Sequence, residues 1–421
     1  MSELRSPGAA RTRLEDPTSL WRRSGYPDEL ARSFERGFCQ GSLPTVGLEE
    51  ELILVEPDSL EPADEAERLL VALGGDRRFK LELRAAQLEL VTPVCLTVAD
   101  ARRELAGARA ELVEQLAGRG RTLAVGTHPF STRPITISQQ PRYVGIALEC
   151  PWVVRRGLPS GLHVHVAVGD AGEALAVFNA ARSYLPELAA LAANSPFFEG
   201  RDTGLASSRL KLCEDLPRAG IPPAFSSWHE LASFVVWGVR GRLFRDLSYL
   251  WWDIRPRPEY GTLEFRVADS QNDLDSAAAI AAVCQTLVVA LQTRLRSGER
   301  LAVHPSHMIN ENRWRALRGG LDGELVDLET GVPESTRDRL ARLLSELEPH
   351  ASELACREQL AHARSLLADG GGAERQRVIV GERGLAGLVE WLADTTEGAP
   401  LGFPAPAFTA NSLGPDPALP A

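Results

Sequence analysis

The sequence of 421 residues has little that would direct it to a membrane or to an oxidising compartment. Its six cysteines are scattered without a Cys-X-X-Cys pair, which indicates buried free thiols in a reducing cytosol. Residues 1–40 are rich in arginine and acidic residues and lack the apolar core of a secretory signal. The most apolar segment, residues 277–291, is shorter than a membrane span and contains Gln285 and Thr286. We therefore expect a cytoplasmic protein without a membrane partner, in which this segment forms a buried helix.

The sequence also lacks the motifs of several common enzyme classes. It contains no Walker A loop, no Gly-X-Gly-X-X-Gly fingerprint, no Gly-X-Ser-X-Gly elbow and no His-Glu-X-X-His helix. The formal net charge of -11 argues against general affinity for nucleic acid, because neutralising phosphates needs an accessible basic surface. Any nucleotide must therefore be held by another arrangement, and anionic substrates must be bound by local arginines.

The order of strand-like and helical segments predicts an α+β fold. Strand-like runs occupy residues 45–55, 81–91, 121–125, 162–168 and 262–267. Helical spacing of apolar residues occupies residues 97–118, 173–194, 276–296 and 334–395. Thr97 and Asp100 form a capping signal, and Pro186 and residues 370–372 interrupt two of the helical segments. Strict βαβ alternation is missing, which favours an antiparallel or mixed sheet over a doubly wound parallel one.

No internal repeat and no strong linker divides the main part of the chain. We predict an N-terminal extension (residues 1–40), one catalytic domain with a C-terminal helical portion (residues 41–395), and a tail (residues 396–421). The tail is rich in Pro, Gly and Ala, so we predict that it is disordered.

Acidic and histidine side chains recur at every second residue in four short stretches, residues 47–51, 87–89, 161–165 and 261–266. Side chains two residues apart on a β-strand share a face, so Glu49 lies beside Glu51 and His163 beside His165. Two neighbouring carboxylates both stay ionised at neutral pH only with a counter-charge nearby. Carboxylates with one or two imidazoles suit Mg²⁺ or Mn²⁺ better than a structural zinc. The pattern therefore predicts a metal-lined catalytic sheet.

Each of these features alone also has a plainer interpretation. An acidic run is often a solvated edge strand, and a single His163 is often an ordinary core or surface histidine. The combination with Glu89 among apolar neighbours and with Glu264 beside Arg266 favours a functional site. Glu82 lies seven residues before Glu89, so the chain between them must bulge or turn if both reach this site.

Arginines supply the complementary charge. Arg255 and Arg266 are each suited to grip a carboxylate or phosphate through a bidentate fork, and each is equally suited to an ordinary surface ion pair. Arg201 and Arg209 lie in a polar segment, residues 194–209, that we interpret either as a mobile loop over the site or as an ordinary connector.

Eight short strings in this order resemble the bacterial carboxylate-amine ligases related to glutamate-cysteine ligase type 2. They are residues 47–51, 87–93, 126–130, 161–166, 200–204, 251–256, 261–267 and 311–316. The resemblance covers roughly residues 45–393, nearly all of the chain that we expect to be ordered. More distantly, the Glu-X-Glu, Gly-X-His-X-His and Glu-X-Arg strands look like those of the glutamine synthetase superfamily.

The resemblance implies a curved antiparallel sheet that forms an active-site funnel with helices packed outside, ATP at one end and the amino-acid substrates at the other. It implies Mg²⁺, with Mn²⁺ as an alternative ion, bound by Glu49, Glu51, Glu82, Glu89, His163 and Glu264. It implies catalytic roles for Glu264, for Arg266 at the γ-phosphate or acyl phosphate, and for Arg255 at substrate or phosphate oxygens. The implied nucleotide contacts are His165, Arg209 and Arg201.

The implied reaction is an ATP-dependent ligation of the γ-carboxylate of glutamate to cysteine or another amine through an acyl phosphate, as in glutathione-type biosynthesis. The partners are then small molecules, and the oligomeric state stays open, a homodimer included. Two alternatives are a metal-dependent hydrolase or oxygenase that uses the His-X-His strand, and a non-catalytic nucleotide-binding relative. Leu52 and Ser208 stand where the family usually has phenylalanine and an aromatic residue, so the acceptor amine is not specified.

Overall fold

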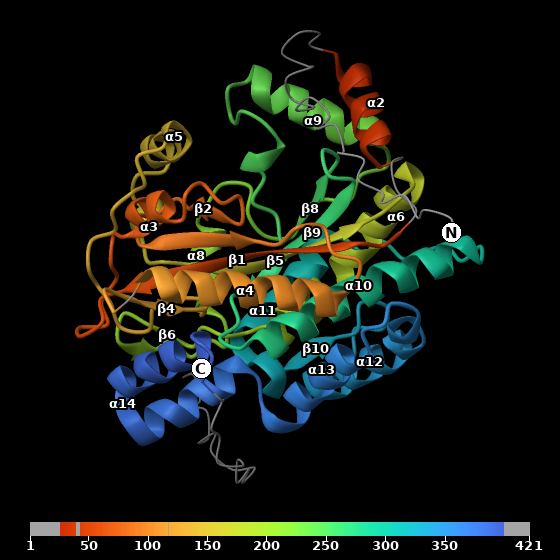
Figure 1. Cartoon of the computed structure of the whole chain (residues 1–421). Helices are drawn as coiled ribbons and strands as arrows, with labels where there is room; N and C mark the ends of the chain where they lie inside the picture. Colours follow the sequence, from red (N-terminus) through yellow and green to blue (C-terminus); the bar gives the residue numbers. More distant parts are fainter. Residues whose placement is uncertain (1–25, 39–42, 117, 400–421) are drawn as a thin grey trace, which may run out of the picture.

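The computed structural model describes residues 26–38, 43–116 and 118–399 (Figure 1). Its centre is an antiparallel sheet with the strand order β2-β3-β1-β5-β9-β8, in which β4 pairs with the second half of β1. The strands are β1 Val46–Val55, β2 Phe79–Leu81, β3 Gln87–Val91, β4 Arg121–Leu123, β5 Gly161–Ala167, β8 Ile254–Arg257 and β9 Thr262–Asp269. The α+β class and the antiparallel sheet are confirmed.

Two long helices cover one face of this sheet. Helices α4 (Val98–Leu116) and α10 (Leu274–Arg296) lie side by side against β1, with α4 also on β3 and α10 also on β5. The other helices are α2 Pro27–Phe38, α3 Ala66–Ala72, α5 Pro141–Glu149, α6 Ala171–Ala181, α7 Leu185–Leu191, α8 Ser208–Glu214, α9 Trp228–Arg240, α11 Ser306–Gly319, α12 Thr336–Glu353, α13 Arg357–Asp369 and α14 Gly372–Thr396. Two small hairpins are formed by β6 Phe197–Phe198 with β7 Arg201–Asp202, and by β10 Glu324–Val326 with β11 Pro333–Ser335.

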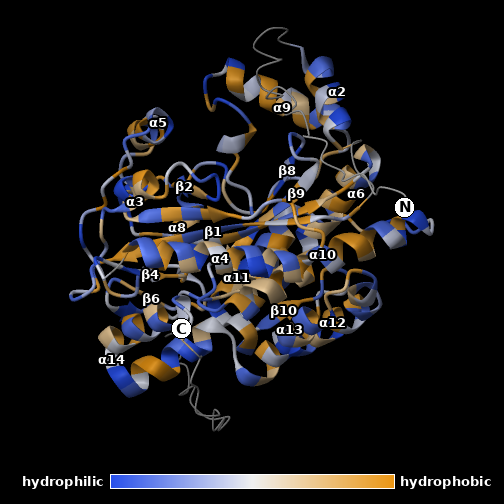
Figure 2. Ribbon diagram, viewed as in Figure 1, coloured by the Kyte–Doolittle hydropathy of each residue, from blue (hydrophilic) through white to orange (hydrophobic). Residues whose placement is uncertain are grey.

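The two faces of β1 have different environments. Leu48, Leu52 and Leu54 point toward α4 and α10 and are at most 1% exposed. Helix α4 starts as predicted, because the Thr97 hydroxyl accepts a hydrogen bond from the Asp100 N–H at 3.1 Å. Figure 2 shows both hydrophobic and hydrophilic residues on α4, α12 and α13, as expected for helices with one face against a core. On the opposite face, the first half of β1 carries Glu49 and Glu51, whereas Ile53 and Val55 of the second half are buried in a second hydrophobic cluster.

The strand register brings charged residues of different strands opposite one another on that polar face. Residues that pair directly across neighbouring strands have side chains in contact distance. The cross-strand pairs are Glu51 with Glu89, Glu49 with His163, His165 with Glu264, and Glu264 with Arg255.

Strand β9 also contains a bulge that the sequence did not reveal. Leu162 pairs with Ala268 and Val164 pairs with Phe265, so β9 has one residue more than β5 between these two pairs. A bulge bends a strand and changes the direction of its side chains. Here it directly follows Phe265, and Arg266 is one of the two residues within it.

Helix α10 contains the apolar segment expected to form a buried helix. It is long and apolar enough to cross a membrane by length and composition, and 83% of its most apolar window is buried inside the protein. It is the one helix of the described residues with these properties. Its burial against the sheet and α4 agrees with the expected core position.

Two predicted segments are divided in the structure. The strand predicted at residues 81–91 is two strands, β2 and β3, joined by a turn. The helix predicted at residues 173–194 is divided into α6 and α7 by a 3-10 turn, Arg182–Tyr184, and Pro186 lies in the first turn of α7. Proline lacks the N–H needed inside a helix and is tolerated in its first turn, so it starts a new helix instead of bending the old one.

Part of the predicted N-terminal extension packs on the main body of the protein. Helix α2 lies against α9, where the Phe38 ring stacks on Trp228 with centroids 5.0 Å apart. Gly37 of α2 touches the turn between β8 and β9, where an added Cβ would lie 2.1 Å from the Pro258 oxygen. Residues 1–25 of the extension and 400–421 of the predicted tail lie outside the described residues, and the domain boundaries stay a prediction.

One charged residue of β1, Glu50, lies on the face covered by helices. Its fully buried carboxylate is held by Arg109 of α4, with Nε–Oε2 at 2.8 Å and Nη2–Oε1 at 2.6 Å. Arg109 also donates to the backbone oxygens of Gln271 and Asn272, just before α10. This buried pair therefore ties together the strand and both covering helices.

Replacing Arg109 by Met should lower the free energy of unfolding by about 3–5 kcal/mol, because Glu50 would be left as an uncompensated buried charge. The control is Arg102→Met, which breaks the exposed pair with Asp275 and should change it by about 1 kcal/mol or less. Urea denaturation of both variants measures the difference. Similar losses in the two variants would contradict the structural role of the buried pair.

Candidate active site

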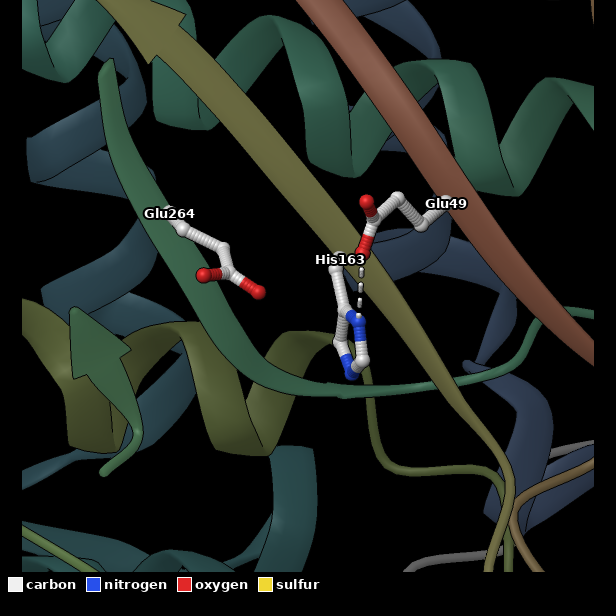
Figure 3. A group of neighbouring side chains, drawn as sticks. All are labelled: Glu49, His163 and Glu264. Carbon is white, nitrogen blue, oxygen red and sulfur yellow. Dashed lines mark hydrogen bonds and ion pairs between the residues drawn. The ribbon is translucent and has the colours of Figure 1, made fainter. Parts of the chain in front are cut away.

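Three predicted metal ligands converge on the polar face of the sheet (Figure 3). Glu49 comes from β1, His163 from β5 and Glu264 from β9, and one potential ligand atom of each lies within 4.8 Å of the others. The Glu49 Oε2 atom is 3.4 Å from His163 Nδ1. Segments more than 200 positions apart in the sequence thus meet in one cluster, as the alternating pattern predicted.

The two histidines of β5 both face this cluster. The His165 Nε2 atom lies 3.6 Å from Glu49 Oε1 and 4.0 Å from Glu264 Oε1, and its Nδ1 is 2.9 Å from the Thr262 hydroxyl. The Nε2 atoms of His163 and His165 are buried and have no hydrogen-bond partner among the described residues. Buried polar atoms normally have a partner, so these nitrogens fit a site that holds a cation between imidazoles and carboxylates.

The remaining predicted carboxylates line an adjoining cavity of about 310 Å³. Glu51, Glu82 and Glu89 lie on its wall together with Glu49 and His163. Glu82 reaches the cavity because the chain turns between β2 and β3, which is the irregularity that its spacing from Glu89 required. The structure therefore brings all six predicted metal ligands to one region, although Glu264 lies beneath the lining.

Lys80 joins this acidic group and was not foreseen. Its Nζ atom is 2.7 Å from Glu89 Oε1 and 3.8 Å from Glu49 Oε1. The available signal was the period of two in β2, which places residues 80 and 82 on one face of a strand. The Lys80 ammonium therefore neutralises part of the charge of these carboxylates.

Glu264 is surrounded by three arginines. Arg255 binds it through both ends of a fork, with Nε–Oε2 at 2.9 Å and Nη2–Oε1 at 3.0 Å. Arg257 Nη1 lies 3.1 Å from Oε2, and Arg266 Nη1 lies 2.5 Å from Oε1 and 3.3 Å from His163 Nδ1. Arg257 was missed, because a single arginine in a short strand has no distinguishing local pattern.

The two predicted catalytic arginines differ in how they are used. Arg255 is buried, and its Nη1 donates to the backbone oxygens of Ser248 and Leu250 in addition to the fork on Glu264. The Arg266 side chain keeps 17% of its surface exposed and lines the cavity. Arg255 is thus placed to orient Glu264, whereas Arg266 is placed to meet a ligand.

Charge determines the ionisation of the cluster. Burial alone would raise the pKa of Glu264, but the charges of Arg255, Arg266 and Arg257 hold it well below its usual value. Burial also opposes ionisation of Glu49, yet hydrogen bonds with His163 and His165 hold its pKa well below the usual value. Both of these carboxylates are therefore ionised at neutral pH.

The carboxyls on the β2–β3 side behave in the opposite way. Burial, followed by the charges of Glu49 and Glu82, raises the pKa of Glu89 well above its usual value. Burial and the charge of Glu51 raise the pKa of Glu82 to about 7. Burial is the first cause of both shifts and the neighbouring carboxylates add to it, so Lys80 offsets only part of the cost of ionising this side of the cavity.

The predicted nucleotide contacts are only partly brought together. Arg209 is buried and lines the cavity, and His165 contacts the cluster. Arg201, in contrast, is exposed on β7 and is not among the residues that line this cavity. Its hairpin is fixed by the neighbouring Asp202, which pairs with Arg377 of α14 at 2.9 Å. The mobile loop over the site is therefore not what the described residues form.

The two departures from the family pattern lie away from the cavity. Leu52 is fully buried in the core, as expected for an apolar exchange. Ser208 is 4% exposed, donates to the Ser195 backbone oxygen at 2.7 Å, and lies 3.2 Å from the Thr127 hydroxyl. An aromatic ring at position 208 would have to displace these contacts, so this serine belongs to the local packing below the site.

Comparisons with known proteins agree with the geometry. The family model described as Glutamate-cysteine ligase family 2 (GCS2) matches residues 45–384. A protein of Rubrobacter xylanophilus named "Putative glutamate--cysteine ligase 2-3" is 39% identical over 361 residues, which cover 84% of this chain and 97% of that protein. One of Thermobifida fusca named "Putative glutamate--cysteine ligase 2" is 38% identical over 349 residues, which cover 81% and 88%.

Solved structures share the fold at low sequence identity. The glutamate-cysteine ligase of Francisella tularensis in complex with AMP has a TM-score of 0.65 and 14% identity, over 87% of this chain and 91% of that chain. A bifunctional glutathione synthetase of Pasteurella multocida has a TM-score of 0.61 and 14% identity, over 91% and 54%. The family match and the sequence identity over most of the chain show that this protein belongs to glutamate-cysteine ligase family 2 and is a carboxylate-amine ligase, an enzyme that forms carbon-nitrogen bonds.

Proposed function

We propose that this ligase uses ATP to join the γ-carboxylate of glutamate to an amine, cysteine or another, through an acyl phosphate. The observation that carries the proposal is the convergence of Glu49, His163 and Glu264 beside Arg266 on one cavity. The related Francisella ligase was crystallised with AMP, which supports a nucleotide as one of the substrates. The alternative chemistry, that of a hydrolase or oxygenase, would leave the arginines around this cluster without a role.

One group of ligands is close enough to hold a divalent ion, and the proposal assigns a second ion to three carboxylates that line the same cavity. Glu49, His163 and Glu264 form one group, and the second group is Glu51, Glu82 and Glu89. When bound, Mg²⁺ or Mn²⁺ neutralises charge on the β- and γ-phosphates of ATP. The ionised state of Glu49 and Glu264 and the unpaired Nε2 atom of His165, 3.6 Å from Glu49 and 4.0 Å from Glu264, support a cation at the first group.

The arginines act on the reacting groups. A carboxylate is a poor acyl donor, so one of its oxygens attacks the γ-phosphorus, ADP leaves, and the amine then displaces phosphate from the acyl phosphate. Arg266 faces the cavity and stabilises the charge that develops on the transferred phosphoryl group. Arg255 is a positioning residue, because it holds Glu264 at both oxygens and so fixes the carboxylate that bonds Arg266.

The cavity also has a wall that limits water. An acyl phosphate hydrolyses in water, so the enzyme must exclude solvent between the two steps. Four apolar side chains contribute to the lining of the cavity, those of Trp251, Trp252, Leu210 and Leu216. This apolar wall supports a small organic acceptor as the second substrate.

The purified full-length protein should release ADP only when Mg²⁺, ATP and both organic substrates are present, because the acyl phosphate needs an acceptor to turn over. The measurement is a screen of amino-acid and amine pairs with glutamate as first donor, with ADP detected by a coupled assay and the amide by mass spectrometry. Product formation without ATP would contradict the proposal and would favour the hydrolase or oxygenase alternative.

Glu49→Gln should lower kcat by about 100-fold or more. It removes the charge of one proposed ligand of the divalent ion, and this ion stabilises the transferred phosphate. The matched control is Glu299→Gln, which removes a fully exposed carboxylate paired with Arg294 and should keep the wild-type rate. Circular dichroism and thermal unfolding show whether both variants fold. Full activity of Glu49→Gln would contradict the role of this cluster.

Binding of Mn²⁺, used as a probe ion, should weaken as the pH falls below about 7, because the raised pKa of Glu82 leaves this ligand protonated there. One proton with the pKa of Glu82 contributes a dissociation constant about 10-fold higher at pH 6 than at pH 8, and the raised pKa of Glu89 acts in the same direction. Isothermal titration calorimetry in two buffers of different ionisation enthalpy measures affinity and proton release together. Glu82→Gln should reduce this pH dependence. An unchanged wild-type affinity at pH 6 and pH 8 would contradict the role of Glu82 as a ligand that must lose a proton.

A further inference from the structure

Two buried arginines of the cavity have no acidic partner at hydrogen-bonding distance. Arg84 lies in the turn between β2 and β3 and is 7% exposed, and Arg209 of α8 is 5% exposed. The Nε atoms of both are buried and have no hydrogen-bond partner among the described residues. Two other arginines on the cavity wall, the buried Arg255 and the partly buried Arg257, are bonded to Glu264.

The carboxylate nearest to Arg209 is already used elsewhere. Asp269 Oδ1 is 3.9 Å from Arg209 Nη1, beyond a hydrogen bond. The oxygens of Asp269 instead accept from the Ser195 hydroxyl at 2.7 Å and the Ser207 hydroxyl at 2.9 Å. Arg209 has only long contacts, at 3.3 Å, from Nη1 and Nη2 to the Arg266 backbone oxygen. Its guanidinium therefore keeps bonding capacity for an anion.

Both guanidiniums lie at the Glu51 end of the cavity. Arg209 rests on Gly161, where an added Cβ would be 2.1 Å from Nη2, and the Gly161 N–H donates to Glu51 Oε2 at 2.6 Å. Cys213 lies within electrostatic reach of both Arg84 and Arg209. This end of the cavity is separate from the group of Glu49, His165 and Glu264, which lies on the other side of the His163 ring.

Burying a guanidinium with incomplete hydrogen bonding is unfavourable, although Glu51 and Glu82 lie near Arg84 and Asp269 lies 3.9 Å from Arg209. Two such groups on one cavity are suited to bind a carboxylate. An arginine binds a carboxylate through two parallel hydrogen bonds, which a buried site strengthens. Leu210, Leu216 and Cys213 also line this cavity and supply an apolar surface for the rest of a small organic molecule.

We propose that Arg84 and Arg209 form the subsite for the spectator carboxylate of an amino-acid substrate, the carboxylate that is not activated in the reaction. The chemical identity of that substrate rests on the proposed function, whereas the anion subsite rests on the geometry. Arg209 is thereby assigned to the amino acid instead of to the nucleotide. The subsite makes the enzyme select amino acids over the amines or acids that lack this group.

The test compares each amino acid with the analogue that lacks its spectator carboxylate. Calorimetry with the full chain, Mg²⁺ and a non-hydrolysable ATP analogue measures binding of glutamate against 4-aminobutanoate and of cysteine against cysteamine. The wild type should bind one of the amino acids about 10- to 100-fold more tightly than its analogue, the worth of a charge-assisted hydrogen bond. Which pair shows the difference identifies the donor or the acceptor as the owner of the carboxylate.

Arg84→Gln and Arg209→Gln should each abolish most of this preference, Arg84→Lys should restore part of it, and affinity for the ATP analogue should stay unchanged. The control Arg155→Gln alters a residue outside this cavity that donates to the Ile135 oxygen, and it should keep the preference. Thermal unfolding checks that each variant folds, and Arg84→Lys keeps the test valid if Arg84→Gln does not.

Retention of the preference in both glutamine variants would overturn the subsite, as would a wild type that binds neither amino acid better than its analogue. A loss of ATP-analogue affinity in Arg209→Gln would return this residue to the nucleotide. Because binding is measured without turnover, a preserved preference without ADP release would contradict the proposed function and leave the subsite standing.

Discussion

The constraint on which this structure depends is the compensation of charge on one face of an antiparallel sheet. Alternation along β1, β5 and β9 puts acids and imidazoles on the same face, and the register then places Glu49 opposite His163 and His165 opposite Glu264. Such a face is stable only if cations lie among the acids. Arginines supply this charge around Glu264, whereas the carboxylates near β2 lack a full complement. The proposed binding of a divalent ion depends on this incomplete compensation.

The opposite face follows a simpler rule. Apolar side chains of the strands meet α4 and α10, and the single buried carboxylate there, Glu50, has its own arginine in Arg109. The sheet thus separates a helix-covered face, on which Glu50 is bonded to Arg109, from a cavity in which the compensation of charge is incomplete. Functional sites commonly break the rules that the core obeys.

Much of this arrangement could be predicted from the sequence, because the information is local. A period of two shows which side chains of a strand share a face, and this placed Glu49, Glu51 and His163 correctly. Glu82 could be placed only conditionally, since the turn before β3 depends on contacts outside the local sequence. Lys80 was missed for a different reason: its partners come from β1 and β3, and register between strands is a long-range property. The same limit applies to Arg84, Arg109 and Arg257, whereas Arg201 was drawn to the site by its motif and lies outside it.

Lys80 has one more consequence, for the thermodynamics of ion exchange. The Lys80 ammonium already contacts Glu89, so a divalent ion that binds there would have to displace it. The apparent affinity of the carboxylates for the ion is then reduced, because the free energy of the Lys80 contact must be subtracted from that of ion binding. In the proposed function, such a centre would hold a metal ion together with the phosphates and would release it with the spent nucleotide, because the Lys80 ammonium would again take its place beside Glu89.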